Sequence, residues 1–179
     1  MSVLIGLLRA VNVGGTGKLP MAELKALCEK AGFSRVQTYI ASGNVIFESN
    51  KAASKAKALL EKSLESYAKK PVGVVIRTPT EMADVLAANP FSKQTSNCTV
   101  AIFLDKAPPA DTLDFVTGMK DEKISLGKRE IYVFYGAGMG RSKLRIPAAA
   151  AGTARNMNTV AKLAELAASR AVDGKKRSE

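Results

Sequence analysis

The chain has 179 residues, of which 46 % are hydrophobic and 24 % charged, the ordinary composition of a globular protein with one domain or two small ones. Lys and Arg outnumber Asp and Glu by 27 to 16, and the net charge of +11 suits anionic partners as well as a role in solubility alone. No apolar run reaches the roughly 20 residues that a membrane helix requires, so we expect no membrane partner.

The residue types present exclude several classes of site. The sequence has no histidine and two cysteines, Cys28 and Cys98, in unrelated contexts. Histidine-assisted nucleophiles, histidine metal sites and a disulfide framework are therefore excluded, and we predict neither a metal nor a cofactor. The N-terminal segment lacks the basic region and the cleavage site of a secretory signal, so we expect a cytoplasmic location.

The first half of the chain predicts six elements in the order strand, helix, strand, strand, helix, strand. The strands are expected at residues 3–8, 36–40, 44–48 and 72–77, and the helices at residues 20–32 and 51–68. This order is that of the ferredoxin-like plait, a split βαβ unit with both helices on one face of the sheet.

The second half repeats part of this order. It begins with Thr78-Pro79-Thr80-Glu81, a capping-box sequence that predicts a short helix ending at Asn89-Pro90. Strands are expected at residues 99–104, 122–126 and 130–135, and helices at residues 110–117 and 159–171, the last capped by Asn158. No closing strand is predicted. We therefore expect an α+β protein with two ferredoxin-like modules, residues 1–77 and a less regular 78–179 that ends in a helix and a basic tail.

Four polar segments lie where predicted strands end or helices begin, and the first runs from Arg9 to Lys18. Its glycines precede a lysine and a helix, an arrangement in which backbone N–H groups can cradle a phosphate. It is not a P-loop, because Asn12 and Leu19 stand where G-x-x-x-x-G-K-[ST] requires a glycine and a hydroxyl. A tight strand-to-helix turn explains the glycines equally well.

Each of the other three segments can likewise be interpreted either as part of an anion site or as an ordinary turn or helix cap. Residues 39–44 form a predicted hairpin turn, for which Ser, Gly and Asn are ordinary residues. Residues 136–143 place an arginine, a serine and a lysine after three glycines, although they do not match G-x-G-x-x-G. Residues 153–159 place Arg155 at the predicted start of the last helix, where free N–H groups favour an anion.

These segments define one candidate ligand-binding site, expected between the two modules. Its predicted members are Arg9, Asn12, Gly14, Lys18, Ser42, Asn44, Gly138, Arg141, Ser142, Lys143, Arg155, Asn156 and Asn158. No carboxylate pair lies near these segments, and Glu48, Asp105 and Glu130 are interpreted as surface charges. The basic-Gly-aromatic pattern of RNA-recognition motifs is absent, which disfavours sequence-specific RNA stacking.

Five stretches together resemble a bacterial family known only as domain of unknown function 1697. They are residues 7–15 with Lys18 and Pro20-Met21, and residues 39–45, 89–91, 138–144 and 154–160. The resemblance implies two plait-like modules in one compact unit and no established activity. The chain departs from the family pattern at Met157, where tryptophan is common, and at residues 145–148, which replace a longer helical stretch.

The sequence favours a binding module for an anionic ligand, either a phosphorylated small molecule or a nucleotide. One alternative is an enzyme that acts on a phosphorylated substrate, with Arg141, Lys143 and Arg155 stabilising charge. The others are a protein-interaction scaffold and sequence-independent binding of a nucleic-acid backbone. The sequence indicates neither the oligomeric state nor the pathway.

Overall fold

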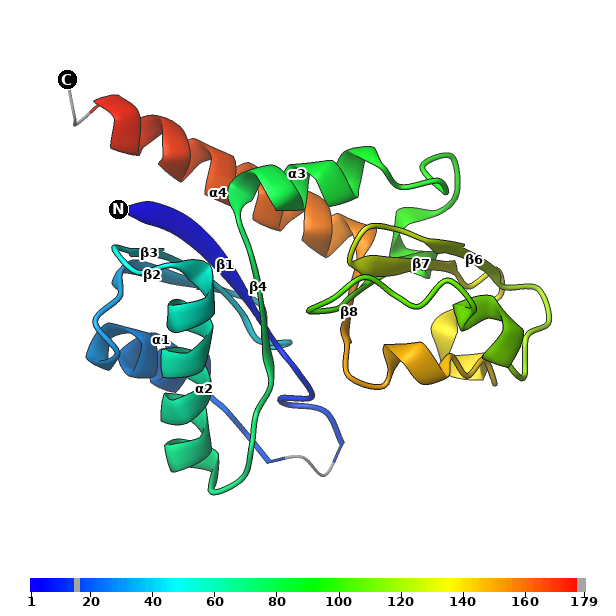
Figure 1. The fold of residues 1–179 in the computed structure, drawn as a ribbon, viewed down its shortest axis with the longest axis horizontal. Helices are drawn as coiled ribbons and strands as arrows, with labels where there is room; N and C mark the ends of the chain where they lie inside the picture. Colours follow the sequence, from blue (N-terminus) through cyan, green and yellow to red (C-terminus); the bar gives the residue numbers. More distant parts are fainter. Residues whose placement is uncertain (15–16, 177–179) are drawn as a thin grey trace. The chain divides into compact units, whose positions relative to one another are not determined.

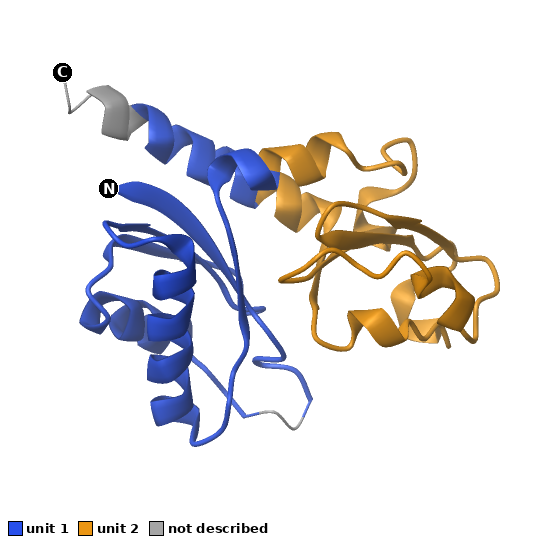
Figure 2. Ribbon diagram, viewed as in Figure 1, with its two compact units in different colours: residues 1–82, 163–179 blue, residues 83–162 orange. Residues whose placement is uncertain are grey.

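The structure is a computed structural model that describes residues 1–14 and 17–176, with side chains up to Val172. Gly15, Thr16 and the last three residues of the predicted basic tail lie outside the described residues. The chain divides into two compact units, Met1–Met82 with Leu163–Glu179 and Ala83–Lys162, called unit 1 and unit 2 below (Figure 2). Both units combine helices with a four-stranded antiparallel sheet, which confirms the α+β class.

Unit 1 contains every element predicted for the first half, close to its predicted bounds. The elements are β1 (Ser2–Leu8), α1 (Met21–Lys30), β2 (Ser34–Tyr39), β3 (Asn44–Ser49), α2 (Ala53–Ala68) and β4 (Val74–Arg77). The strands pair in the order β2-β3-β1-β4, and each neighbouring pair is antiparallel. The first strand is therefore central, and the residues that follow it start from the middle of the sheet.

Helices α1 and α2 cover one face of this sheet (Figure 1). Both helices repeat apolar residues at helical spacing, so that Leu24 and Cys28 of α1 and Leu60 and Leu64 of α2 are buried. Phe47 of β3 is fully buried beneath them and stacks on Phe33 with ring centroids 4.3 Å apart. Burial of these side chains supplies the main stabilisation of the unit.

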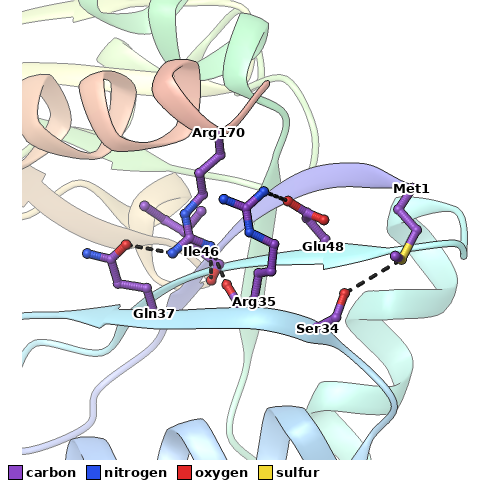
Figure 3. A network of polar contacts seen from close by, with 7 residues as sticks. All are labelled: Met1, Ser34, Arg35, Gln37, Ile46, Glu48 and Arg170. Atoms are coloured by element: carbon purple, nitrogen blue, oxygen red, sulfur yellow. Dashed lines mark hydrogen bonds and ion pairs between the residues drawn. The ribbon is translucent and has the colours of Figure 1, made fainter. Parts of the chain in front are cut away.

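The C-terminal part of α4 (Met157–Lys176) belongs to unit 1, where Arg170 forms hydrogen bonds with the edge strand β2 (Figure 3). The β2–β3 pairing shifts register between Ser34 and Gln37, so the ladder is interrupted there. The Arg170 guanidinium donates to the Arg35 carbonyl at this interruption and to Oε1 of Gln37 at 2.6 Å. The division thus differs from the predicted one, which assigned the whole helix to the second module.

Unit 2 contains a second four-stranded sheet with the strand order β6-β7-β5-β8. The strands are β5 (Thr99–Phe103), β6 (Lys123–Leu126), β7 (Glu130–Phe134) and β8 (Thr153–Asn156), again antiparallel. The helix predicted after the capping box is α3 (Pro79–Ala87), which runs from unit 1 into unit 2. Thr78 and Glu81 exchange the two hydrogen bonds of a capping box, 3.2 Å to the Thr78 hydroxyl and 2.8 Å to the Glu81 carboxylate.

The helix predicted at residues 110–117 is wrong. Only a short 3-10 turn, η2 (Thr112–Phe115), forms there. Leu113 and Phe115 are 48 % and 60 % exposed, so the segment has no apolar stripe to bury, and an isolated helix of this length is unstable in water. Other 3-10 turns, η3 (Met139–Arg141) and η4 (Pro147–Ala149), occupy the connection between β7 and β8.

The prediction that the second half lacks a closing strand is also wrong. Strand β8 pairs with β5, placing Arg155 opposite Ala101. The strand could not be predicted from alternating apolar residues, because its buried positions are the polar residues Thr153 and Arg155. Helix α4 consequently begins at Met157, and its cap is Asn156, whose Oδ1 accepts the Thr159 N–H at 2.9 Å, rather than the predicted Asn158.

Among the described residues, no helix is both long enough and apolar enough to cross a membrane.

Candidate functional site

The loop after β1 is closed by one side chain, that of Asn12. Its Oδ1 accepts the Leu19 N–H at 2.7 Å, and its Nδ2 donates to the Leu19 carbonyl at 2.9 Å. The same Nδ2 donates to the Ala41 carbonyl at 2.8 Å in the β2–β3 turn. Asn12 has a φ of 54°, a left-handed conformation that asparagine tolerates better than most residues. The amide therefore fixes both the loop base and the neighbouring turn.

The β2–β3 turn lies directly against the end of β1. The Leu8 N–H donates to the Gly43 carbonyl at 2.8 Å. A Cβ at Gly43 would lie 2.5 Å from Cγ2 of Val11, and its φ of +84° also requires glycine. Asn44 is fully buried and donates to the Tyr39 carbonyl at 2.9 Å and to the Ser42 hydroxyl at 3.0 Å. The first two polar segments thus lie side by side.

These segments form the walls of a hollow of about 640 Å³ at the start of α1, called the loop hollow below. Its described lining is Asn12, Val13, Gly14, Gly17, Lys18, Leu19, Pro20, Met21 and Ala41. Lys18 is the charged member, and none of these described residues is acidic. Helix α1 has no side-chain cap at Pro20, so its first N–H groups add positive potential near the hollow.

A second hollow of about 490 Å³, called the tyrosine hollow below, lies across the same loop. Its described lining is Ala10, Val11, Gly17, Lys18, Leu19, Leu64, Tyr67, Ala68, Lys70 and Val72. Val11, Leu19 and Leu64 are buried, whereas the Tyr67 side chain is 41 % exposed. Tyr67 and Lys70 are not among the predicted site residues, because a single aromatic residue and a lysine at a helix end carry no local signal in the sequence.

In unit 2 the loop of residues 136–143 forms hydrogen bonds with two carboxylates, those of Asp121 and Glu122. The Ser142 hydroxyl donates to Oε1 of Glu122, and the Lys120 N–H donates to Oε2 of Glu122 at 2.6 Å. These hydrogen bonds, that of Ser142 first, hold the pKa of Glu122 below its usual value. The Ala137 N–H donates to Oδ2 of Asp121 at 3.1 Å. The adjoining hollow, which Gly138, Arg141 and Lys143 also line, measures only about 180 Å³.

Arg155 is buried in β8, with 6 % of the residue exposed. Its Nη1 donates to Oγ1 of Thr153 at 2.6 Å and to the Ala154 carbonyl at 2.9 Å, both in its own strand. Burial lowers its pKa to about 10, so the guanidinium is still charged at neutral pH. The described hydrogen bonds of Asn156 and Asn158 are also internal: Asn156 caps α4, and Asn158 accepts from the Ser96 hydroxyl at 2.7 Å.

Glu130 was interpreted as a surface charge, and this is wrong. It is 5 % exposed at the start of β7, where its carboxylate accepts the Lys128 and Arg129 N–H groups at 3.1 and 3.2 Å. It therefore holds the β6–β7 turn. Glu48 forms an ion pair with Arg35 at 2.7 Å. Buried acids such as Glu122 and Glu130 could not be distinguished by sequence because they lie beside strands like any surface glutamate.

The predicted site residues thus form separate groups. Asn12, Gly14 and Lys18 line the loop hollow, and the turn holding Ser42 and Asn44 lies against it. Arg9 is exposed and is not among the described lining of either hollow, and its backbone N–H donates to the Gly73 carbonyl at 2.9 Å. Gly138, Arg141, Ser142 and Lys143 line the hollow of unit 2, whose described lining does not include Arg155, Asn156 or Asn158. One site for all of them would join both units and stays a prediction.

Among the described residues, no group of three or more Cys, Asp and Glu side chains could hold a metal ion. What unit 1 offers instead is a hollow lined by Lys18 and two glycines, beside a loop base that Asn12 holds by hydrogen bonds. Such a hollow can bind an anion through a lysine and backbone N–H groups.

Comparison with known proteins gives the fold and the family. The chain superimposes with a TM-score of 0.75 on the structure of a conserved bacterial protein, SP0830, from Streptococcus pneumoniae, at 23 % sequence identity, covering 93 % of this chain and 98 % of that one. This likeness shows a shared fold. No curated protein matches the chain. A family model described as "Protein of unknown function (DUF1697)" matches residues 1–132, and the chain belongs to this family.

Proposed function

We propose that this protein binds a phosphorylated small molecule in the loop hollow of unit 1. The observation that carries the proposal is the hollow itself, about 640 Å³ in volume, with Lys18 and two glycines on its wall and no acidic residue among its described lining. Its volume lies within the range of small-molecule sites. The net charge of +11 raises the local concentration of anions around such a site.

Unit 1 is a better place for this ligand than unit 2. The hollow of unit 2 is smaller, at about 180 Å³, and Asp121 and Glu122 line it beside the cations. A carboxylate near a bound phosphate is repulsive. The Ser142 hydroxyl is already engaged by Glu122 and by the Leu144 N–H, the latter at 3.1 Å. We therefore propose that Gly138, Arg141, Ser142 and Lys143 serve the structure of unit 2 more than ligand binding.

The proposal is tested by calorimetric titration with ribose 5-phosphate. Lys18→Ala should weaken binding about 10-fold or more, the effect of losing a hydrogen bond to a charged group. The matched control is Lys62→Ala on α2, an exposed lysine of the same unit that lines neither hollow. Equal affinities of the Lys18→Ala and Lys62→Ala proteins would reject the proposal, as would the absence of binding to the unmodified chain.

The salt dependence separates a small molecule from a nucleic-acid backbone. A single-stranded backbone gives a log–log slope of about −0.7 for each phosphate neutralised, whereas one compact phosphate gives a shallow slope. We expect ribose 5-phosphate to bind with the shallow slope. A short single-stranded DNA that binds more tightly, with a steep slope, would favour the nucleic-acid alternative.

We also propose that unit 1 is a ferredoxin-like plait and that the protein is cytoplasmic. The plait is supported by the βαββαβ order of unit 1 together with the antiparallel strand order β2-β3-β1-β4. The location is supported by Cys28 and Cys98, both present as free thiols.

A further inference from the structure

The two hollows of unit 1 share a wall. Residues 17–19 line both the loop hollow and the tyrosine hollow. Lys18 is therefore within reach of a ligand in either space. A molecule that extends over this wall can place an anionic group on one side of it and a different chemical group on the other.

The tyrosine hollow has the chemistry of a site for a flat apolar group. Its floor is made of the buried side chains Val11, Leu19 and Leu64. Tyr67 lies on its wall near the end of α2, and the residue is 41 % exposed. The Tyr67 side chain makes no hydrogen bond, ion pair or ring contact with any described residue. An aromatic face that is unengaged and lines a concave space is a stacking platform for another ring.

The charges around the tyrosine hollow restrict the ligand further. Lys18 and Lys70 line it, and none of its described lining residues is acidic. The ring-bearing ligand must therefore tolerate or carry negative charge. The hollows, at about 640 and 490 Å³, are each in the size range of small-molecule sites, so together they suit a molecule larger than a sugar phosphate.

From these observations we infer that the ligand is a nucleoside monophosphate, with its base stacked on Tyr67 and its phosphate held at Lys18. This inference rests on the proposed function, because it assumes that the anion site is in unit 1. It adds the base of the ligand to the proposed phosphate, and it assigns recognition of this base to Tyr67. Stacking on an aromatic ring is tolerant of base identity, so Tyr67 selects a nucleotide without selecting one base.

The experiment compares adenosine 5′-monophosphate with ribose 5-phosphate by calorimetry. The two probes share the phosphate and the sugar, so their affinity ratio isolates the base. On the unmodified chain AMP should bind about 10-fold more tightly, within the range for one stacked base. Tyr67→Ala should reduce this ratio to about 1 without changing the affinity for ribose 5-phosphate, whereas Tyr67→Phe should retain the ratio.

The possible failures are distinguishable. Equal binding of both probes to the unmodified chain, with both weakened by Lys18→Ala, would overturn the inference and leave the proposed function standing. A tighter binding of AMP that survives in Tyr67→Ala would also overturn the inference, because the base would then lie elsewhere. If neither probe binds, or if Lys18→Ala changes neither affinity, the proposed function fails and the inference fails with it.

Discussion

Units 1 and 2 share one strand arrangement and cover it differently. In each unit the first strand lies between the third and the fourth, and all neighbours are antiparallel. In unit 1 the helices α1 and α2 follow the first and third strands, whereas in unit 2 those places hold only 3-10 turns (Figure 1). There, Leu144, Ile146 and Ala148 pack against the core of the sheet. A strand frame of this kind thus requires apolar cover, which a loop can provide as well as a helix.

The units also share particular contacts at the ends of their strands. In unit 1 the backbone N–H of Leu8, the last residue of β1, donates to the Gly43 carbonyl at 2.8 Å. In unit 2 the N–H of Leu104, which follows β5, donates to the Arg129 carbonyl at 2.8 Å. In both units the end of the first strand is thus hydrogen-bonded to the hairpin turn. Arg77 and Arg155, in the fourth strands, each donate from Nη1 to the preceding carbonyl, at 3.0 and 2.9 Å. These repeated contacts are structural.

The loop that follows the first strand also differs between the units. Unit 1 has the glycine-rich loop that Asn12 closes and that lines both hollows. In unit 2, Asp105 and two prolines at 108–109 lead to the turn η2 instead. Because unit 2 has the same strand arrangement without the glycine-rich loop, the sheet of unit 1 does not require this loop. The loop after β1 is therefore available for ligand binding, which supports the ligand site proposed in unit 1.

The largest effect on the free energy of unfolding is expected for side chains of the segments that pack on the two sheets. Leu60 of α2 is fully buried, so Leu60→Ala should lower the free energy of unfolding by about 2–5 kcal/mol through lost burial and a cavity. Phe115→Ala in η2 should change it by less than about 0.5 kcal/mol, because that side chain is mostly exposed. Urea unfolding measures both. A large effect of Phe115→Ala would show that η2 is as important to its sheet as α2.

A second test concerns the hairpin turn against the first loop. Gly43→Ala would force a Cβ into Val11 and Leu8, at 2.5 and 2.9 Å, in a left-handed conformation. We expect a loss of about 2–4 kcal/mol, the sum of the two effects. The control is Gly14→Ala, where a Cβ would meet no atom of the described residues within 4 Å. Thermal unfolding of the two variants should therefore differ clearly, and matching transition temperatures would mean that the turn can move away from β1.

The buried arginine of unit 2 gives a third, smaller effect. Arg155→Ala removes charge-assisted hydrogen bonds to Thr153 and Ala154 and should cost about 1.5–3 kcal/mol of folding stability. If Arg155 instead belongs to the ligand site, as its sequence context predicts, its loss should reduce affinity. Exposed Arg141 provides the control, because Arg141→Ala should leave stability unchanged. Unaltered stability of Arg155→Ala, with loss of ribose 5-phosphate binding, would restore Arg155 to the site.

The smallest effect is a pH dependence confined to unit 2. Hydrogen bonds from Ser142 and Lys120 lower the pKa of Glu122 in the folded state, so its contribution to stability is present above the unfolded pKa and is lost as the pH falls through the folded one. Glu122→Gln should therefore flatten the decline of stability on the acid side. Urea midpoints between neutral and acid pH measure this, and an unchanged decline would show that the hydrogen bonds to Glu122 contribute little.

The elements of unit 1 could be predicted because each has a clear apolar pattern, as in α2 with Leu60 and Leu64. Strand β8 could not, because its buried positions are Thr153 and Arg155, and the segment around Leu113 misled because its apolar residues face solvent. For the site, the sequence indicated that the glycine-rich loop was unusual.

The sequence could not show what Asn12 does, since its three hydrogen bonds join it to Leu19 and Ala41, which are seven and 29 residues away along the chain. Tyr67 was missed for the same reason. It belongs to the candidate site only because the fold places the end of α2 beside the loop after β1.

Titration of the isotopically labelled chain with ribose 5-phosphate, followed by amide chemical shifts, shows directly which hollow holds the phosphate. We expect saturable shifts at Gly14, Gly17 and Lys18, which line the loop hollow, and none at Gly138 or Lys143 in the hollow of unit 2. Shifts confined to the unit 2 residues, or no saturable shift at any of these amides, would contradict the ligand site proposed in unit 1.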